Sequence, residues 1–87
     1  MIVLVENAMC TGKIPPREWE MEGRTGTTYK VEISDGQGSM ELQCSDEDIY
    51  NKFEAFQRYD VDIDLKQTNY EGRKGVKALI TFAQAAN

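Results

Sequence analysis

The feature that most constrains this chain is the order in which two hydrophobic periodicities occur along it. Apolar residues alternate with polar ones in several segments, and one helix-like apolar stripe interrupts that alternation. A period of two is typical of a strand with one buried face, whereas apolar residues three and four positions apart are typical of a helix. The order of these patterns predicts a small all-β domain with one helix.

Three strands are expected before the helix. Trp19 and Met21 alternate with glutamates, Val31 and Ile33 alternate with polar residues, and Leu42 lies in a third alternating segment. Glycine-rich turns separate these segments, so they form a meander. The predicted strands cover residues 18–23, 28–33 and 39–44.

The helix is expected to begin at Ser45. This residue offers an N-cap hydroxyl, and Asp48 follows at the capping-box position. Ile49, Phe53 and Phe56 stand at i, i+4 and i+7, which predicts a helix of about three turns with one apolar stripe. We expect this stripe to pack against one end of a barrel.

Two further strands are expected in residues 60–66 and 76–82, with a loop over residues 68–75 between them. The order of three strands, a helix and two strands is that of the five-stranded Greek-key barrel called the OB-fold. Eighty-seven residues leave no room for a second core, so residues 1–87 are predicted to form a single domain.

The two ends of the chain are expected to lie outside the central pattern. Residues 1–17 form an N-terminal strand or arm, in which residues 1–5 add a strand or lengthen the first one. Pro15 and Pro16 interrupt pairing because proline cannot donate to a ladder. The segment 13–17 is either a connector, which we favour, or an arm that clasps nucleic acid or a partner, and residues 83–87 are expected to fray.

The residue inventory argues against an enzyme. The chain has no histidine, and Cys10 and Cys44 do not form a Cys-x-x-Cys pair, so metal sites, triads and cofactor chemistry find no material. Alternate strand positions for Asp60, Asp62 and Asp64 favour a solvated face over a calcium cage. A buried reduced thiol at Cys44, and an N-terminal apolar run too short for a membrane span, predict a cytoplasmic protein.

The stretch Gly26-Thr27-Thr28-Tyr29-Lys30-Val31-Glu32-Ile33-Ser34-Asp35-Gly36 resembles the second strand and following turn of OB-fold single-stranded-DNA-binding proteins. From Trp19 to Phe82 the order and spacing of elements are similar to the small gene V type helix-destabilising proteins of filamentous phages and to related proteins of mobile elements. The resemblance implies a small dimer that coats single-stranded DNA without reading sequence in replication or transfer. It also implies a site on the barrel face and on the loops between strands one and two and strands four and five.

Those two loops contain the residue types that such binding needs. Cations follow the phosphates and aromatic rings stack on bases. The candidate nucleic-acid-binding residues are Arg24 in the first loop, with Tyr29 and Lys30 close behind it, and Tyr70 in the second loop, with Arg73, Lys74 and Lys77 just after it.

Several of these residues have a second interpretation. Tyr29 has the same strand parity as Val31, so its ring either caps the core or stacks a base. Trp19 has the parity of Met21 and is favoured as a core residue. Lys74 and its neighbours either bind DNA or only solubilise a hairpin.

The charge distribution leaves a second function open. Residues 1–31 carry no net charge, residues 32–64 carry −8 and residues 65–87 carry +3. Glutamates at positions 18, 20, 22, 32 and 41 are expected on the face where OB ligands lie, and they would oppose phosphate. The alternatives are an OB module whose acidic face binds a protein partner of a replication or transfer complex, and a DNA mimic. A homodimer is expected in either case, because open barrels leave strand edges unpaired.

Overall fold

The computed structural model describes residues 1–86. Five strands close a barrel in the order β1-β2-β3-β5-β4, and one helix lies between the third and fourth strands, so the predicted OB-fold architecture is confirmed. The elements are β1 (Ile2–Met21), β2 (Arg24–Ser34), β3 (Ser39–Cys44), α1 (Glu47–Lys52), β4 (Gln57–Tyr70) and β5 (Arg73–Ala85). Within these residues the one helix is too short and too polar to cross a membrane.

The first strand is much longer than its alternating segment indicated. Residues 2–10 of β1 pair with β4, and residues 9–21 pair with β2, so β1 belongs to both halves of the barrel. Pro15 and Pro16 fall in a register shift between Ile14 and Arg17. A bulge accommodates prolines because it requires no ladder donor there. The N-terminal residues therefore lengthen the first strand, and segment 13–17 is part of it rather than a connector.

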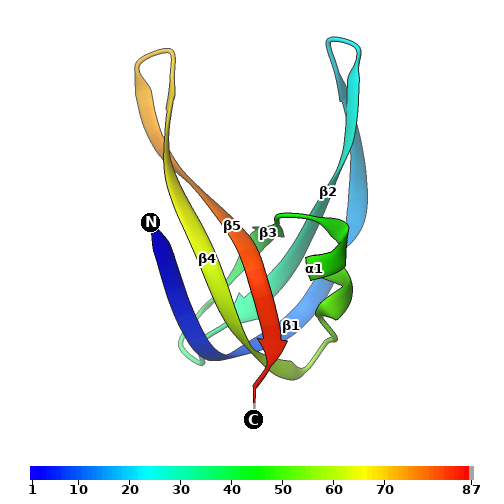
Figure 1. Cartoon of the computed structure of the whole chain (residues 1–87), viewed down its shortest axis with the longest axis vertical. Helices are drawn as coiled ribbons and strands as arrows, with labels where there is room; N and C mark the ends of the chain where they lie inside the picture. The colour runs from blue at the N-terminus through cyan, green and yellow to red at the C-terminus, as the bar shows by residue number, and fades with distance from the viewer. Residues whose placement is uncertain (87) are drawn as a thin grey trace.

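Two hairpins extend beyond the barrel as separate arms (Figure 1). We call residues 17–28 of β1 and β2 arm 1, and residues 66–77 of β4 and β5 arm 2. The arms give the molecule a long dimension of 43 Å against 25 and 19 Å. In Figure 1 the C-terminal end of β5 lies at the opposite end of the molecule from the arm tips.

Both arms close through a Glu-Gly turn of the same conformation. Glu22 and Gly23 have φ values of 51° and 77°, and Glu71 and Gly72 have 50° and 78°. Positive φ at both central residues is the signature of the two-residue type I′ turn, whose twist matches that of the strands. The loop expected over residues 68–75 is therefore wrong, since only two residues separate the strands.

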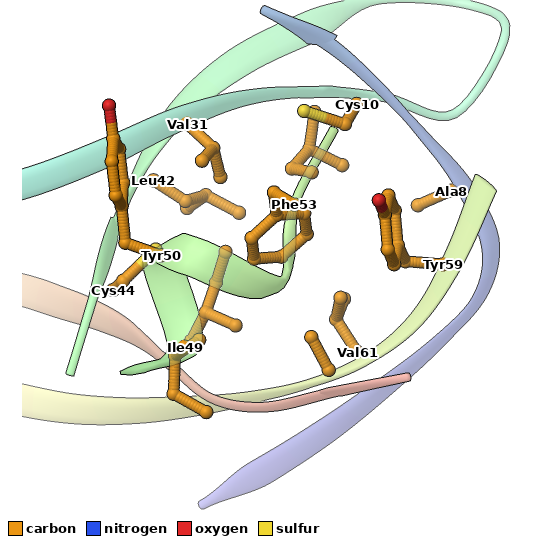
Figure 2. Packing of buried hydrophobic residues seen from close by; sticks show 13 residues of the cluster. Ala8, Cys10, Val31, Leu42, Cys44, Ile49, Tyr50, Phe53, Tyr59 and Val61 are labelled. Carbon is orange, nitrogen blue, oxygen red and sulfur yellow. The ribbon is translucent and has the colours of Figure 1, made fainter. Parts of the chain in front are cut away.

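The helix is shorter than predicted, and its cap is different. The carboxylate of Asp46, not the hydroxyl of Ser45, accepts the N–H of Ile49 at 2.9 Å. The chain leaves the helix at Phe53, whose ring lies among the labelled core residues of Figure 2. Phe56 lies beyond the helix with φ 66° and a side chain 72% exposed, so the predicted three-turn stripe is wrong.

The barrel interior is filled by side chains from every element. Phe53 packs on Tyr59, with ring centroids 4.8 Å apart, and the Tyr59 hydroxyl accepts the N–H of Glu54 at 2.7 Å. The fraying expected from residue 83 onward is wrong for residues 83–85, because β5 continues to Ala85 and Ala83 is buried. Residue 87 lies outside the described residues. The buried core consists of Ala8, Cys10, Val31, Ile33, Leu42, Cys44, Ile49, Tyr50, Phe53, Tyr59, Val61, Ile80 and Ala83.

Both cysteines are buried free thiols. Burial raises the pKa of Cys10, and it raises the pKa of Cys44 to about 11. Each thiol therefore stays protonated near neutral pH and behaves as a small apolar group. The prediction of a buried, reduced Cys44 agrees with this arrangement.

Candidate nucleic-acid interface

The two faces of arm 1 differ sharply in composition. Side chains alternate between the two faces of a hairpin, and directly paired residues share a face. On β2, Tyr29 shares the face of the core residue Val31, so Lys30 and Thr28 lie on the opposite face. We call this opposite side the arm 1 face. It carries Ile14, Arg17, Trp19 and Met21 of β1 and Arg24, Gly26, Thr28 and Lys30 of β2.

The strand pairing separates the acidic residues of arm 1 from its cations. Glu18 pairs with Thr27 and Glu20 pairs with Thr25, so both glutamates lie on the side of Tyr29. The expectation that Glu18 and Glu20 lie on the face of the ligand is therefore wrong for the arm 1 face, whereas Glu32 and Glu41 lie on the side of Lys30 as expected. Arg17 and Arg24 lie on the arm 1 face, away from both glutamates. The physical reason is the bulge at Pro15 and Pro16. Because it shifts the register between Ile14 and Arg17, the odd-numbered residues of β1 beyond it face the same side as Ile14.

Trp19 is the most exposed ring system on arm 1, and it is not a core residue. Its side chain is 45% exposed and pairs with Gly26 across the hairpin. The indole lies directly on this glycine, because a Cβ built there would come within 2.6 Å of Trp19 Cε2. One ring face is thus supported by backbone and the ring remains accessible. The interpretation of Trp19 and Met21 as core residues fails because arm 1 projects past the barrel, where neither face is covered.

A groove of about 180 Å³ opens at the root of the arm 1 face. Arg17 lines it from β1, Thr28 and Lys30 line it from β2, and Glu41 lines it at its barrel side. Beyond it, Glu41 lies directly opposite Glu32, so the acidic barrel surface begins where the groove ends. The groove therefore presents two cations at its arm side and one carboxylate at its barrel side, and the paired glutamates would repel a phosphate that approached the barrel.

The predicted residues of arm 2 divide between its two faces. Tyr70 pairs directly with Arg73, and Lys66 pairs directly with Lys77, all on the side opposite the barrel core. Lys74 pairs with Asn69 and lies on the other face. Like charges directly opposite each other destabilise a sheet unless an anion compensates them. Lys66 has Asp64 at 3.5 Å, whereas Lys77 has no carboxylate within salt-bridge distance among the described residues.

Apart from Lys66, the cations of both arms have no ion-pair partner among the described residues. In residues 1–86 the ion pairs are those of the N-terminal ammonium and Lys66 with Asp64. The side chains of Arg17 and Arg24 on arm 1, of Lys30 at its root and of Arg73 on arm 2 are therefore free to meet an external anion. This is notable in a chain with 15 carboxylates and 10 cationic side chains.

Tyr29, one of the predicted nucleic-acid-binding residues, packs against the barrel core instead of standing free. Its ring packs against the core cluster and lies 5.3 Å from the Tyr50 ring, and its hydroxyl donates to Glu47 Oε2 at 3.1 Å. Partial burial and the Glu47 carboxylate raise the pKa of Tyr29. Of the two interpretations left open, the structure supports capping of the core.

Residues that the sequence argument overlooked complete the site. Arg17 lies on the arm 1 face rather than in a connector, and Trp19 lies on the same face rather than in the core. The sequence marks the hairpins, though not these two residues, by a repeat: the letters Glu-Gly-Arg-x-Gly occur at residues 22–26 and again at 71–75. In each copy the turn precedes an arginine that pairs with an exposed large residue, Met21 or Tyr70.

The described residues contain no group of three or more histidine, cysteine, aspartate or glutamate side chains placed to hold a metal ion. The arrangement offers two exposed rings, Trp19 and Tyr70, cations without an ion-pair partner in residues 1–86 and a groove at the root of arm 1. No family model, curated protein or solved structure matches the chain.

Proposed function

We propose that this protein binds single-stranded DNA without sequence preference and performs no chemistry on it. The observation that carries the proposal is the Trp19 ring, supported by Gly26 and accessible to a ligand, on a face that also presents Arg17 and Arg24. Stacking on an aromatic ring contributes about 1–3 kcal/mol per base and tolerates any base. Unpaired arginines next to the ring supply phosphate contacts, whose strength falls with salt.

Arm 2 supports the same function with a net positive charge, which arm 1 lacks. Arm 2 carries four cations and one carboxylate, whereas arm 1 carries two arginines and three glutamates. Tyr70, 75% exposed, stands at the tip of arm 2 beside Arg73. A strand held by both arms would gain stacking on each of them and most of its charge neutralisation from arm 2.

The resemblance to gene V type proteins agrees with this function and extends it. On that basis we propose a cytoplasmic homodimer that coats single strands during replication or transfer of a phage or mobile element. The arms leave strand edges unpaired on both hairpins, which favours association with a second copy. Light scattering during gel filtration, with and without an oligonucleotide, measures the number of chains per particle.

The test of binding is an anisotropy titration of fluorescein-labelled oligo-dT against the wild type at low and moderate salt. Two variants locate the site: Trp19→Ala on arm 1 and the triple variant Tyr70→Ala/Arg73→Ala/Lys74→Ala on arm 2. Arg58→Ala, an exposed cation near the opposite end of the barrel, is the matched control. Absence of binding by the wild type at micromolar protein and low salt would rule out the proposal.

A protein-binding function on the acidic face of β4 is the second candidate. Asp62 lies between exposed Leu4 and Phe82, a combination that suits a basic partner with apolar side chains. Its two acidic neighbours have structural partners, however. Asp60 accepts the N–H of Asn7 at 2.9 Å, and Asp64 contacts the N-terminal ammonium and Lys66. Of the carboxylates on this face, Asp62 and Glu6 are without such a partner among the described residues, and we rank the function below DNA binding.

A further inference from the structure

The backbone ladder alone does not fix the direction of arm 1. Pairing with β2 is interrupted between Ile14 and Arg17, where Pro15 and Pro16 have no N–H to donate. Beyond this point arm 1 is a two-stranded ribbon, and such ribbons are marginally stable without further packing. The angle between arm 1 and the barrel therefore depends on side-chain contacts at its root.

Those contacts come from the short helix α1. The Tyr50 hydroxyl donates to the Ile14 carbonyl oxygen at 2.9 Å, on the barrel side of the proline bulge. The ring centroids of Tyr50 and Tyr29 lie 5.3 Å apart, and the Lys13 ammonium lies 4.2 Å from the ring centroid of Tyr50. Three residues before Tyr50, Glu47 accepts the Tyr29 hydroxyl at 3.1 Å. One turn of helix thus holds both strands of arm 1 at the point where they leave the barrel.

We propose that Tyr50, acting with Tyr29, positions arm 1 and so sets the geometry of its binding face. Figure 2 shows Tyr50 at the margin of the core, with its hydroxyl pointing away from the other labelled side chains. A phenylalanine ring would fill the same space in the core, so the hydroxyl is the part of Tyr50 that serves arm 1. The consequence for DNA rests on the function proposed above, while the positioning itself concerns the protein without DNA.

Trp19, the single tryptophan of the chain, reports the motion of arm 1 directly. We would record time-resolved fluorescence anisotropy of Trp19 in the DNA-free protein for the wild type, Tyr50→Phe and Tyr29→Phe. The matched control is Tyr59→Phe, which removes another tyrosine hydroxyl bonded to the backbone, within the core and away from arm 1. We expect a larger fast-depolarisation amplitude for the first two variants and a wild-type amplitude for Tyr59→Phe.

Oligo-dT affinity is measured on the same four proteins. Loss of one hydrogen bond that orients the arm should weaken binding by Tyr50→Phe about two- to tenfold, with no such change for Tyr59→Phe. An unchanged depolarisation amplitude in Tyr50→Phe would refute the positioning role. A raised amplitude with unchanged affinity would refute its importance for binding. If the wild type does not bind oligo-dT, the proposed function fails, and the anisotropy of the free protein still decides the positioning role.

Discussion

Substitution of Gly26 by alanine tests the proposed site without altering any group that would contact DNA. Gly26 does not have a positive φ, so alanine fits its backbone conformation. The new methyl group would come within 2.6 Å of Trp19 Cε2, whereas carbon atoms pack at about 3.5–4.0 Å. The indole must therefore move by about 1 Å from its position on the hairpin.

The size of the effect follows from the stacking energy. A complete loss of one stacked base costs about 1–3 kcal/mol, which is about 5- to 160-fold in affinity. A displaced ring keeps part of this contact, so we expect Gly26→Ala to weaken oligo-dT binding by about 1 kcal/mol, or about fivefold. Folding should survive, since replacing glycine by alanine also removes about 0.4–1 kcal/mol of unfolded-state freedom.

The assay combines tryptophan emission of the free protein with an oligo-dT titration. Gly12→Ala is the matched control, because a Cβ there meets no atom within 4 Å and Gly12 lies outside arm 1. We expect altered emission and weaker binding for Gly26→Ala, and wild-type behaviour for Gly12→Ala. Wild-type emission in Gly26→Ala would refute the packing argument, and altered emission with wild-type affinity would refute the role of Trp19 as a stacking platform.

Three other predictions follow from single features. Arg73→Ala and Lys77→Ala should each reduce the slope of log affinity against log salt by about 0.7, and Lys74→Ala on the opposite face should reduce it less; equal slopes for all three would contradict the division of faces. Glu22→Asn should raise the melting temperature, since asparagine tolerates φ 51° better than glutamate does; a lower melting temperature would contradict the turn assignment. Between pH 9 and 11 the unfolded Cys44 thiol loses its proton while the buried thiol keeps it, so the free energy of unfolding falls as pH rises. Denaturant titrations should show a smaller fall for Cys44→Ala, and an equal fall in both proteins would contradict a buried, protonated thiol.

The fold could be predicted from the sequence because the barrel strands carry their own signal. Val31 and Ile33 alternate with polar residues since one side of β2 faces the core, and Val61 does the same on β4. Few small folds have three strands before one short helix and two strands after it. Periodicity reports burial, so it succeeds wherever one face of a strand is buried.

The arms could not be predicted in the same way, because neither of their faces is buried. Around Trp19 the alternation continues, but it separates two kinds of exposed surface rather than core from solvent. The proline bulge adds to the difficulty, since the register across Pro15 and Pro16 decides which side of arm 1 Arg17 occupies. Pairing of β1 with β2 settles that question, and pairing depends on residues far apart in the chain.

A net charge of −5 opposes binding to a polyanion, and the distance between the tip of arm 2 and the acidic residues of the barrel weakens this opposition. Most carboxylates belong to residues 32–64, which form the barrel and helix, whereas Arg73 lies at the tip of arm 2. Arg73 pairs with Tyr70, which lies four residues beyond Lys66 on β4. At the rise of a β-strand, Arg73 is therefore about 13 Å from the level of Lys66. Salt screens exposed charges beyond about 8 Å at physiological ionic strength. A phosphate at the tip therefore interacts mainly with the charges of the tip, Arg73, Lys74 and Glu71, and the affinity for DNA should follow the local charge of the arms rather than the net charge of the chain.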